Sequence, residues 1–372
     1  MQVPQIPAFK YHFPPEKIEW VLEKYREILE TGSFLSMGNY CKEFEEKFAS
    51  YVGSKFSVAT NTGSSALEAI LSAIDVRGSD VIVPTNTFAA TAFAVLRAGG
   101  RPVFADCTSD LTVDPDDVKK KITNETKAVV TVHIGGLVSP RTRDLVEICE
   151  KNGIALVEDA AHAHGSELDG KKAGTFGIAG AFSFFSTKVM TMGEGGIIVT
   201  DDDKIRDKAQ LLRDQAKSGG REYHEVVGTN WRMSEHQALL GIVQLEMLDH
   251  FISQRMRVAR VYDREFSNVP GLEPLEIPRI VRHNYYKYVV FGARGFDRGS
   301  LRQKLKQTFG VNLSGSVYEL PCHLQPVFKQ ASEEALPMSE DLCARHICPP
   351  VYVAMEDSDA MYVVDSIRKC VT

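Results

Sequence analysis

Short apolar runs alternate with amphipathic segments through the first 160 residues of the chain. The runs have the length of buried strands, and they lie at residues 56–60, 80–84, 101–106, 129–133 and 154–159. The segments between them predict helices at residues 64–74, 88–97 and 144–151. Strands that alternate with helices predict a mostly parallel, doubly wound sheet, so the expected fold class is α/β.

A longer helical pattern follows, from Trp231 to about Asn268. We expect this helix to lead out of the large domain. The expected boundaries are 1–250 for a large domain with its N-terminal segment and 251–372 for a smaller C-terminal α/β domain. A chain of 372 residues is long enough for two domains and a sizeable core.

The composition of the chain mainly excludes classes of function. The net charge of −6 gives no footprint for nucleic acid or for an anionic membrane surface. No apolar run approaches the ~18 residues of a membrane span, and the N-terminus does not resemble a secretion signal. The seven cysteines have no paired or metal-like spacing, which predicts reduced thiols and no metal site. We therefore expect a cytoplasmic protein that acts on small molecules.

Two residues suggest the chemistry. Lys188 directly follows the segment 181–187, which is largely apolar, and a desolvated lysine has a lowered pKa and can form a Schiff base with a carbonyl. Asp159 ends an apolar strand, at the sheet edge where functional groups collect. Pyridoxal 5'-phosphate needs both, because a carboxylate beside its pyridine nitrogen keeps the ring an electron sink. Alone, Lys188 would be read as a surface charge and Asp159 as a helix cap.

A phosphate site is predicted at the turn 61–65, between a strand and a helix. Backbone N–H groups and hydroxyls at a helix N-terminus can hold an anion, although the same turn is also a common capping motif.

These segments carry a resemblance to a known family. Glu158 to His162, Ser183 with Lys188 five positions later, and Gly193 to Thr200 resemble the sugar aminotransferases of the DegT/DnrJ/EryC1/StrS group. The likeness extends through nearly the whole chain, including 32–38, 60–67 and 230–234. It implies the type I fold of aspartate aminotransferase, with pyridoxal 5'-phosphate bound in the large domain.

The resemblance also implies residue roles. The family's cofactor-binding positions correspond to Gly63, Ser64, Phe88, Asp159, His162, Ser183, Lys188 and Asn230. By resemblance, Lys188 and Asp159 are the catalytic pair, Phe88 stacks on the pyridine ring, and Gly63, Ser64 and Ser183 bind the phosphate. Asn230 matches an asparagine that reaches the phosphate from the neighbouring subunit, which implies a homodimer with shared active sites.

The implied reaction moves an amino group from glutamate or glutamine to a keto sugar, expected to be nucleotide-linked, in amino-sugar, surface-polysaccharide or secondary-metabolite biosynthesis. Related deoxysugar dehydratases have histidine where this chain has Lys188, which favours transamination. Most members have glutamine at the position of His162, so a cyclitol or an aminobenzoate precursor stays open as the acceptor, as in 3-amino-5-hydroxybenzoate synthases. A non-catalytic regulatory or binding protein on the same fold is the alternative of another class.

Other side chains are weaker candidates, each equally consistent with a structural role. They are His133, Arg232, Tyr318 and His323, and the polar stretch around Gly219 and Gly220 is a candidate for the substrate entrance.

Overall fold

The computed structural model of the chain describes residues 3–218, 223–329 and 334–371. Its largest sheet has seven strands in these ranges, in the order β1-β9-β8-β5-β4-β2-β3. Along the sheet these are β1 (Phe56–Thr60), β9 (Gly196–Thr200), β8 (Ala179–Ser183), β5 (Ala155–Asp159), β4 (Thr126–Val132), β2 (Asp80–Pro84) and β3 (Arg101–Ala105). Only β9 runs antiparallel to its neighbours, so the predicted mostly parallel α/β fold is confirmed.

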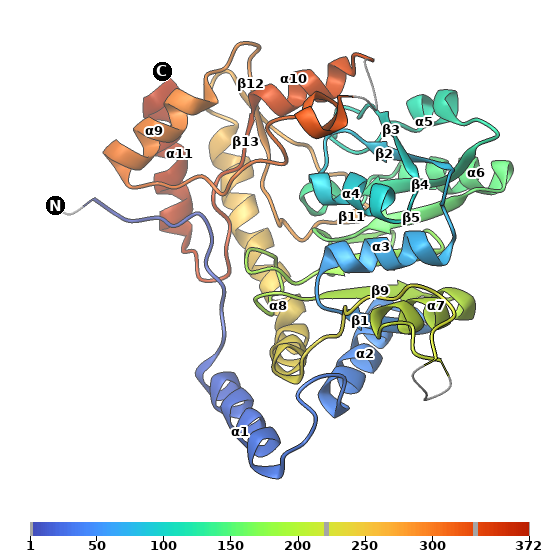
Figure 1. The fold of residues 1–372 in the computed structure, drawn as a ribbon. Helices are drawn as coiled ribbons and strands as arrows, with labels where there is room; N and C mark the ends of the chain where they lie inside the picture. The colour runs from blue at the N-terminus through green and yellow to red at the C-terminus, as the bar shows by residue number, and fades with distance from the viewer. Residues whose placement is uncertain (1–2, 219–222, 330–333, 372) are drawn as a thin grey trace.

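Helices cover both faces of this sheet (Figure 1). The helices that pack on this sheet are α2 (Asn39–Val52), α3 (Gly63–Ala73), α4 (Ala89–Arg97), α5 (Pro115–Lys121), α6 (Thr142–Asn152) and α7 (Asp203–Arg213), whereas α1 (Pro15–Thr31) lies away from it. Side chains alternate along β2: Val81 and Val83 pack into the core with α3 and α4, while Ile82 packs on the opposite face with residues of α5 and α6. A strand that is buried on both faces reads as a continuous apolar run, which is why the sequence pattern located it.

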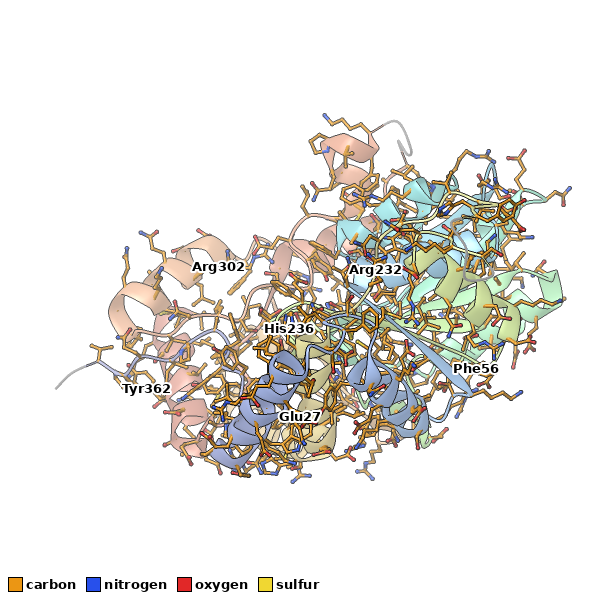
Figure 2. The ribbon with its side chains drawn as sticks, turned by 60° about the horizontal axis from the view of Figure 1, so that its bottom comes forward. Glu27, Phe56, Arg232, His236, Arg302 and Tyr362 are labelled. Carbon is orange, nitrogen blue, oxygen red and sulfur yellow. The ribbon has the colours of Figure 1, made fainter. Side chains whose placement is uncertain are left out.

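The long helix α8 (Glu235–Phe266) starts at a capping box formed by Ser234 and Gln237. Near this start α1 lies against it beside His236 (Figure 2), whose ring meets that of Tyr25 edge to face with centroids 6.0 Å apart. From Val258 onward its apolar side chains join a different core. That core contains residues of the remaining long helices and of a three-stranded sheet: α9 (Arg298–Phe309), α11 (Asp357–Val371), β10 (Leu272–Pro274), β12 (Val290–Gly292) and β13 (His346–Ile347). The domain boundary at residue 250 stays a prediction.

The remaining elements are short. They are β6 (Glu167–Leu168), β7 (Lys171–Lys172), β11 (Val281–Arg282), α10 (Pro337–Arg345) and the 3-10 turns Ile134–Gly136, Cys322–Leu324 and Pro326–Phe328. Within the described ranges, no helix is long and apolar enough to cross a bilayer.

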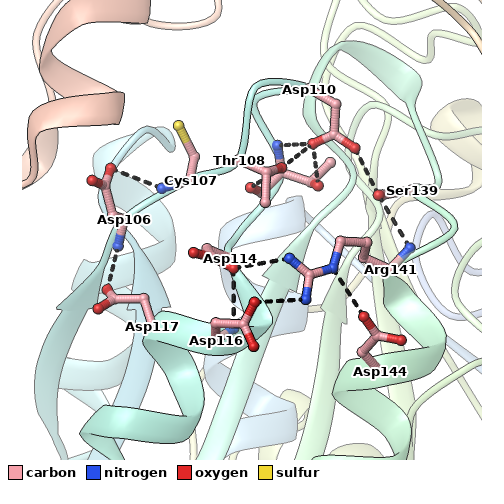
Figure 3. A network of polar contacts seen from close by, with 11 residues as sticks. Asp106, Cys107, Thr108, Asp110, Asp114, Asp116, Asp117, Ser139, Arg141 and Asp144 are labelled. Carbon is pink, nitrogen blue, oxygen red and sulfur yellow. Dashed lines mark hydrogen bonds and ion pairs between the residues drawn. The ribbon is translucent and has the colours of Figure 1, made fainter.

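A polar network holds the segment after β3 against α5 and α6 (Figure 3). The Arg141 guanidinium contacts Asp114, Asp116 and Asp144 at 2.9–3.1 Å. The hydroxyl of Ser139 donates to Asp110 at 2.7 Å. These partly exposed ion pairs each contribute little, so the network mainly fixes the path of the loop.

Candidate active site

A cavity of about 470 Å³ lies where several parallel strands end. Val132, Asp159 and Ser183, the last residues of β4, β5 and β8, form part of its wall. The first turns of α3 and α4 form another part. Seven of the predicted site residues line it: Gly63, Ser64, Phe88, Asp159, His162, Ser183 and Lys188. Parallel strands bring their carboxyl ends to one edge, so residues far apart in sequence meet there.

Asp159 is an anchored carboxylate in apolar surroundings. The hydroxyl of Thr91 donates to its Oδ2 at 2.8 Å, and the backbone N–H of Ala161 donates to its Oδ1 at 3.1 Å. Burial raises the pKa of Asp159, and these two hydrogen bonds act in the opposite direction because they favour the ionised form. The carboxylate is thus held in one orientation, with a cationic partner as its best ligand.

Lys188 is half-buried in the turn after β8. Its Nζ lies 4.8 Å from the centroid of the Tyr286 ring. Burial lowers the pKa of Lys188 from 10.5 to about 8, while the charge of Asp159 acts against this shift. In roughly a tenth of the molecules Lys188 is therefore a free amine at pH 7. A nucleophile or a base at this position requires this form.

The end of the cavity beside α3 combines a helix N-terminus with hydroxyl groups. The Thr62 hydroxyl caps α3 by accepting from the Ser65 N–H at 3.1 Å. Gly63 allows the helix to approach β8, because a Cβ at position 63 would lie 2.7 Å from Cβ of Ser183. The helix N-terminus and the hydroxyls of Ser64 and Ser183 thereby share one wall.

The hydrogen bonds of His162 assign its tautomer. Gly135 N–H donates to Nδ1 at 3.3 Å, and burial lowers the pKa of His162 well below its ordinary value. The ring is therefore neutral and carries its proton on Nε2, which lies 3.1 Å from the Tyr318 hydroxyl and donates to it. The Tyr318 proton is left available to an acceptor in the cavity. The His162 ring also packs on Tyr286, with centroids 4.4 Å apart.

Three of the weaker candidates have other partners. His133 lies 2.7 Å from Glu158, and both are fully buried; it does not line the cavity. Arg232 pairs with Asp214 at 2.6 Å, and the ring of His323 contacts Thr85. Tyr318, by contrast, lines the cavity.

Asn230 does not line this cavity. Its side chain is exposed, and its backbone carbonyl accepts from the Asn61 side chain at 3.5 Å, close in sequence to the anion end. Its predicted role in a partner's site stays a prediction. Gly219 and Gly220 lie outside the described residues.

Sequence reasoning did not assign a site role to several wall residues, among them Thr87, Thr91 and Tyr286. The two threonine hydroxyls lie 2.9 Å apart, four positions from each other at the start of α4. Thr87 precedes the N-cap Phe88 and Thr91 lies in the first turn, so hydroxyls around an expected helix start were the usable signal. No local signal marked Tyr286, which reaches the cavity from the segment between β11 and β12.

The sequence pattern of the DegT/DnrJ/EryC1/StrS aminotransferase family matches residues 15–368. The chain belongs to this family. It is an aminotransferase, and membership favours an enzyme over the non-catalytic alternative. It is 32% identical to a GDP-perosamine synthase of Vibrio cholerae, covering 92% of this chain and 94% of that one.

Two further similarities agree with this assignment. A dTDP-3-amino-3,4,6-trideoxy-alpha-D-glucose transaminase of Micromonospora megalomicea is 31% identical, over 95% of both chains. The crystal structure of DesV from S. venezuelae superimposes with a TM-score of 0.91 at 29% identity and covers 98% of each chain.

Proposed function

We propose that this aminotransferase uses pyridoxal 5'-phosphate to move an amino group from glutamate or glutamine to a nucleotide-linked keto sugar. One observation carries the proposal: a lysine with a lowered pKa, an anchored carboxylate and a helix N-terminus with two hydroxyls line the same cavity.

The residues present fit this cofactor. The cavity has the size of an ordinary small-molecule site. Ser64, Ser183 and the N-terminus of α3 would hold the phosphate, and Asp159 would hold the proton of the ring nitrogen. Phe88, whose side chain is exposed in the isolated chain and lines the cavity, would cover one face of the ring.

Bound pyridoxal phosphate supplies an electron sink for the charge that develops at the donor's α-carbon. Lys188 would attach the cofactor and, when free, accept the α-proton at its Nζ. Its pKa of about 8 suits this task, because a base works best when its pKa lies near the working pH. Because His162 donates to the Tyr318 oxygen, the hydroxyl proton of Tyr318 would be free to bind an oxygen atom of the bound cofactor or substrate.

The acceptor is proposed from the relatives. The names GDP-perosamine synthase and dTDP-amino-sugar transaminase support a nucleotide-linked keto sugar. His162 keeps a cyclitol or an aminobenzoate precursor as the second candidate, because it departs from the glutamine of most members. A homodimer, in which Asn230 completes the partner's phosphate site, and a cytoplasmic location belong to the same proposal.

The test of cofactor binding is a visible absorption titration with pyridoxal phosphate. Wild-type protein should gain a protein-bound band that changes when glutamate is added. Lys188→Ala should not gain it, whereas Lys127→Ala, at an exposed position of β4, should behave like the wild type. A wild-type protein that binds no pyridoxal phosphate would refute the proposal.

The acceptor requires a separate screen. Nucleotide-linked keto sugars and free cyclic ketones are offered to the protein with glutamate or glutamine, and 2-oxo-acid formation is followed. Turnover of the free ketones alone would exclude the nucleotide-sugar acceptor and favour the second candidate.

A further inference from the structure

Arg255 is a buried cation without a counter-charge. Only 4% of the surface of Arg255 is exposed to solvent. Its Nη1 donates to the backbone carbonyls of Tyr285 and Val351 at 3.2 and 2.8 Å, but its Nε has no acceptor. Among the residues that the structure describes, no carboxylate pairs with it. Burial lowers the pKa of Arg255 to about 10, so it is still charged at neutral pH. Proteins usually compensate such a buried charge, because leaving it unpaired is costly.

A small separate cavity lies beside this side chain. It measures about 10 Å³, the space that a single water-sized particle needs. Its wall combines α8, the lysine turn and the N-terminal segment 9–12, which precedes α1. That segment is fixed on α8 by two contacts of His12: Gln244 donates to its carbonyl at 2.9 Å, and its ring packs on Phe251. The segment therefore forms one side of the cavity beside Arg255.

The charges of the wall have one sign. Lys10, Lys188 and Arg255 contribute to it, and no Asp or Glu of the described chain lines it. A cationic wall favours an anion over a metal ion. A carboxylate group is larger than the space, whereas a monatomic anion is the smallest kind of anion and requires the least widening of the wall.

From the buried guanidinium without a counter-charge, the size of the cavity and the sign of its wall, we infer that this cavity binds a single halide ion, held by Arg255 and bordered by residues 9–12. The site is separate from the active-site cavity, although Thr187 and Lys188 line both. Because the anion would join α8, the lysine turn and the N-terminal segment, its binding stabilises the folded chain. This inference does not rest on the proposed substrate or cofactor.

The experiment compares thermal unfolding of the full chain, without added pyridoxal phosphate, in sodium bromide and in sodium isethionate at equal ionic strength. Isethionate is too large for the cavity. We expect bromide to raise the Tm by roughly 2–4 °C at saturating concentration. Arg255→Gln should lose this rise. Arg257→Gln should keep this rise. Arg257 lies about half a helical turn from Arg255 on α8 and pairs with Asp357.

Diffraction supplies a readout that needs no variant, since Arg255→Gln can fail to fold once its links to Tyr285 and Val351 are lost. A wild-type crystal in bromide should give an anomalous peak in contact with the Arg255 guanidinium. Three outcomes would overturn the inference: no peak at this position, a peak without the rise in Tm, which indicates an adventitious ion only, or a rise produced by glutamate and not by bromide.

Discussion

Replacing Lys188 with methionine should stabilise the cofactor-free protein, and the gain should depend on pH. In the folded chain the pKa of Lys188 is about 8, compared with 10.5 for an unperturbed lysine. A difference of this size corresponds to about 3.4 kcal/mol between the charged and neutral forms. Because Lys188 is only half-buried, solvent screening reduces the effect, and we expect about 2 kcal/mol at pH 7.

The sign of the pH dependence follows from linkage. Below pH 8 the lysine is protonated in both states, so the folded wild type bears the full cost of desolvating the charge. Between pH 8 and 10.5 the unfolded chain binds more protons than the folded chain, and the stability of the wild type rises with pH relative to the variant. Above 10.5 the amine is neutral in both states, and the cost is gone.

Urea unfolding of the cofactor-free protein at pH 7 and pH 9.5 measures this difference. We expect the gap between Lys188→Met and wild type to narrow by roughly 1 kcal/mol between the two pH values. Lys127→Met, at an exposed strand position, controls for the loss of a lysine in general. A gap that is the same at both pH values would show that the Lys188 charge is not desolvated, and the argument for a free amine at neutral pH would fail.

Three other predictions concern the same site. His162→Gln should keep most of the activity, because an amide can accept from Gly135 and donate to Tyr318. His162→Leu, which can do neither, should lower kcat at least tenfold without a matching loss of stability, and measuring kcat and the urea midpoint of both variants tests this. Gly63→Ala should weaken pyridoxal phosphate binding and lower stability by about 1–3 kcal/mol, since its Cβ would lie 2.7 Å from Cβ of Ser183; fluorescence titration and urea unfolding measure both, and wild-type affinity would contradict the packing argument. Glu158→Gln should lower stability by about 2–4 kcal/mol, because the two oxygens of the fully buried carboxylate accept backbone N–H bonds from Gly174 and Gly177 at 2.7 Å, and the amide nitrogen would face one of these donors in either orientation; a loss below 1 kcal/mol in urea would refute this.

The sequence by itself determined the elements and the central chemical pair. Apolar runs with strand length marked β1 to β5, and the predicted helix at 64–74 differs from α3 by one residue at each end. These features are local, because the period of apolar side chains reports how each segment is buried. Several motifs in the right order, among them Glu158 to His162, Ser183 with Lys188, and Gly193 to Thr200, likewise indicated the family, as its match over residues 15–368 bears out.

Only the tertiary structure decided how these residues are held. The strand β9 lies antiparallel between β1 and β8, although about 140 residues separate it from β1. Thr91 anchors Asp159, Gly135 fixes the tautomer of His162, and Tyr286 covers Lys188. His133, a weaker candidate that was equally consistent with a structural role, pairs with Glu158. A sequence pattern states which side chains are buried but not which of them meet, because contacts between distant segments depend on the packing of the whole sheet and its helices.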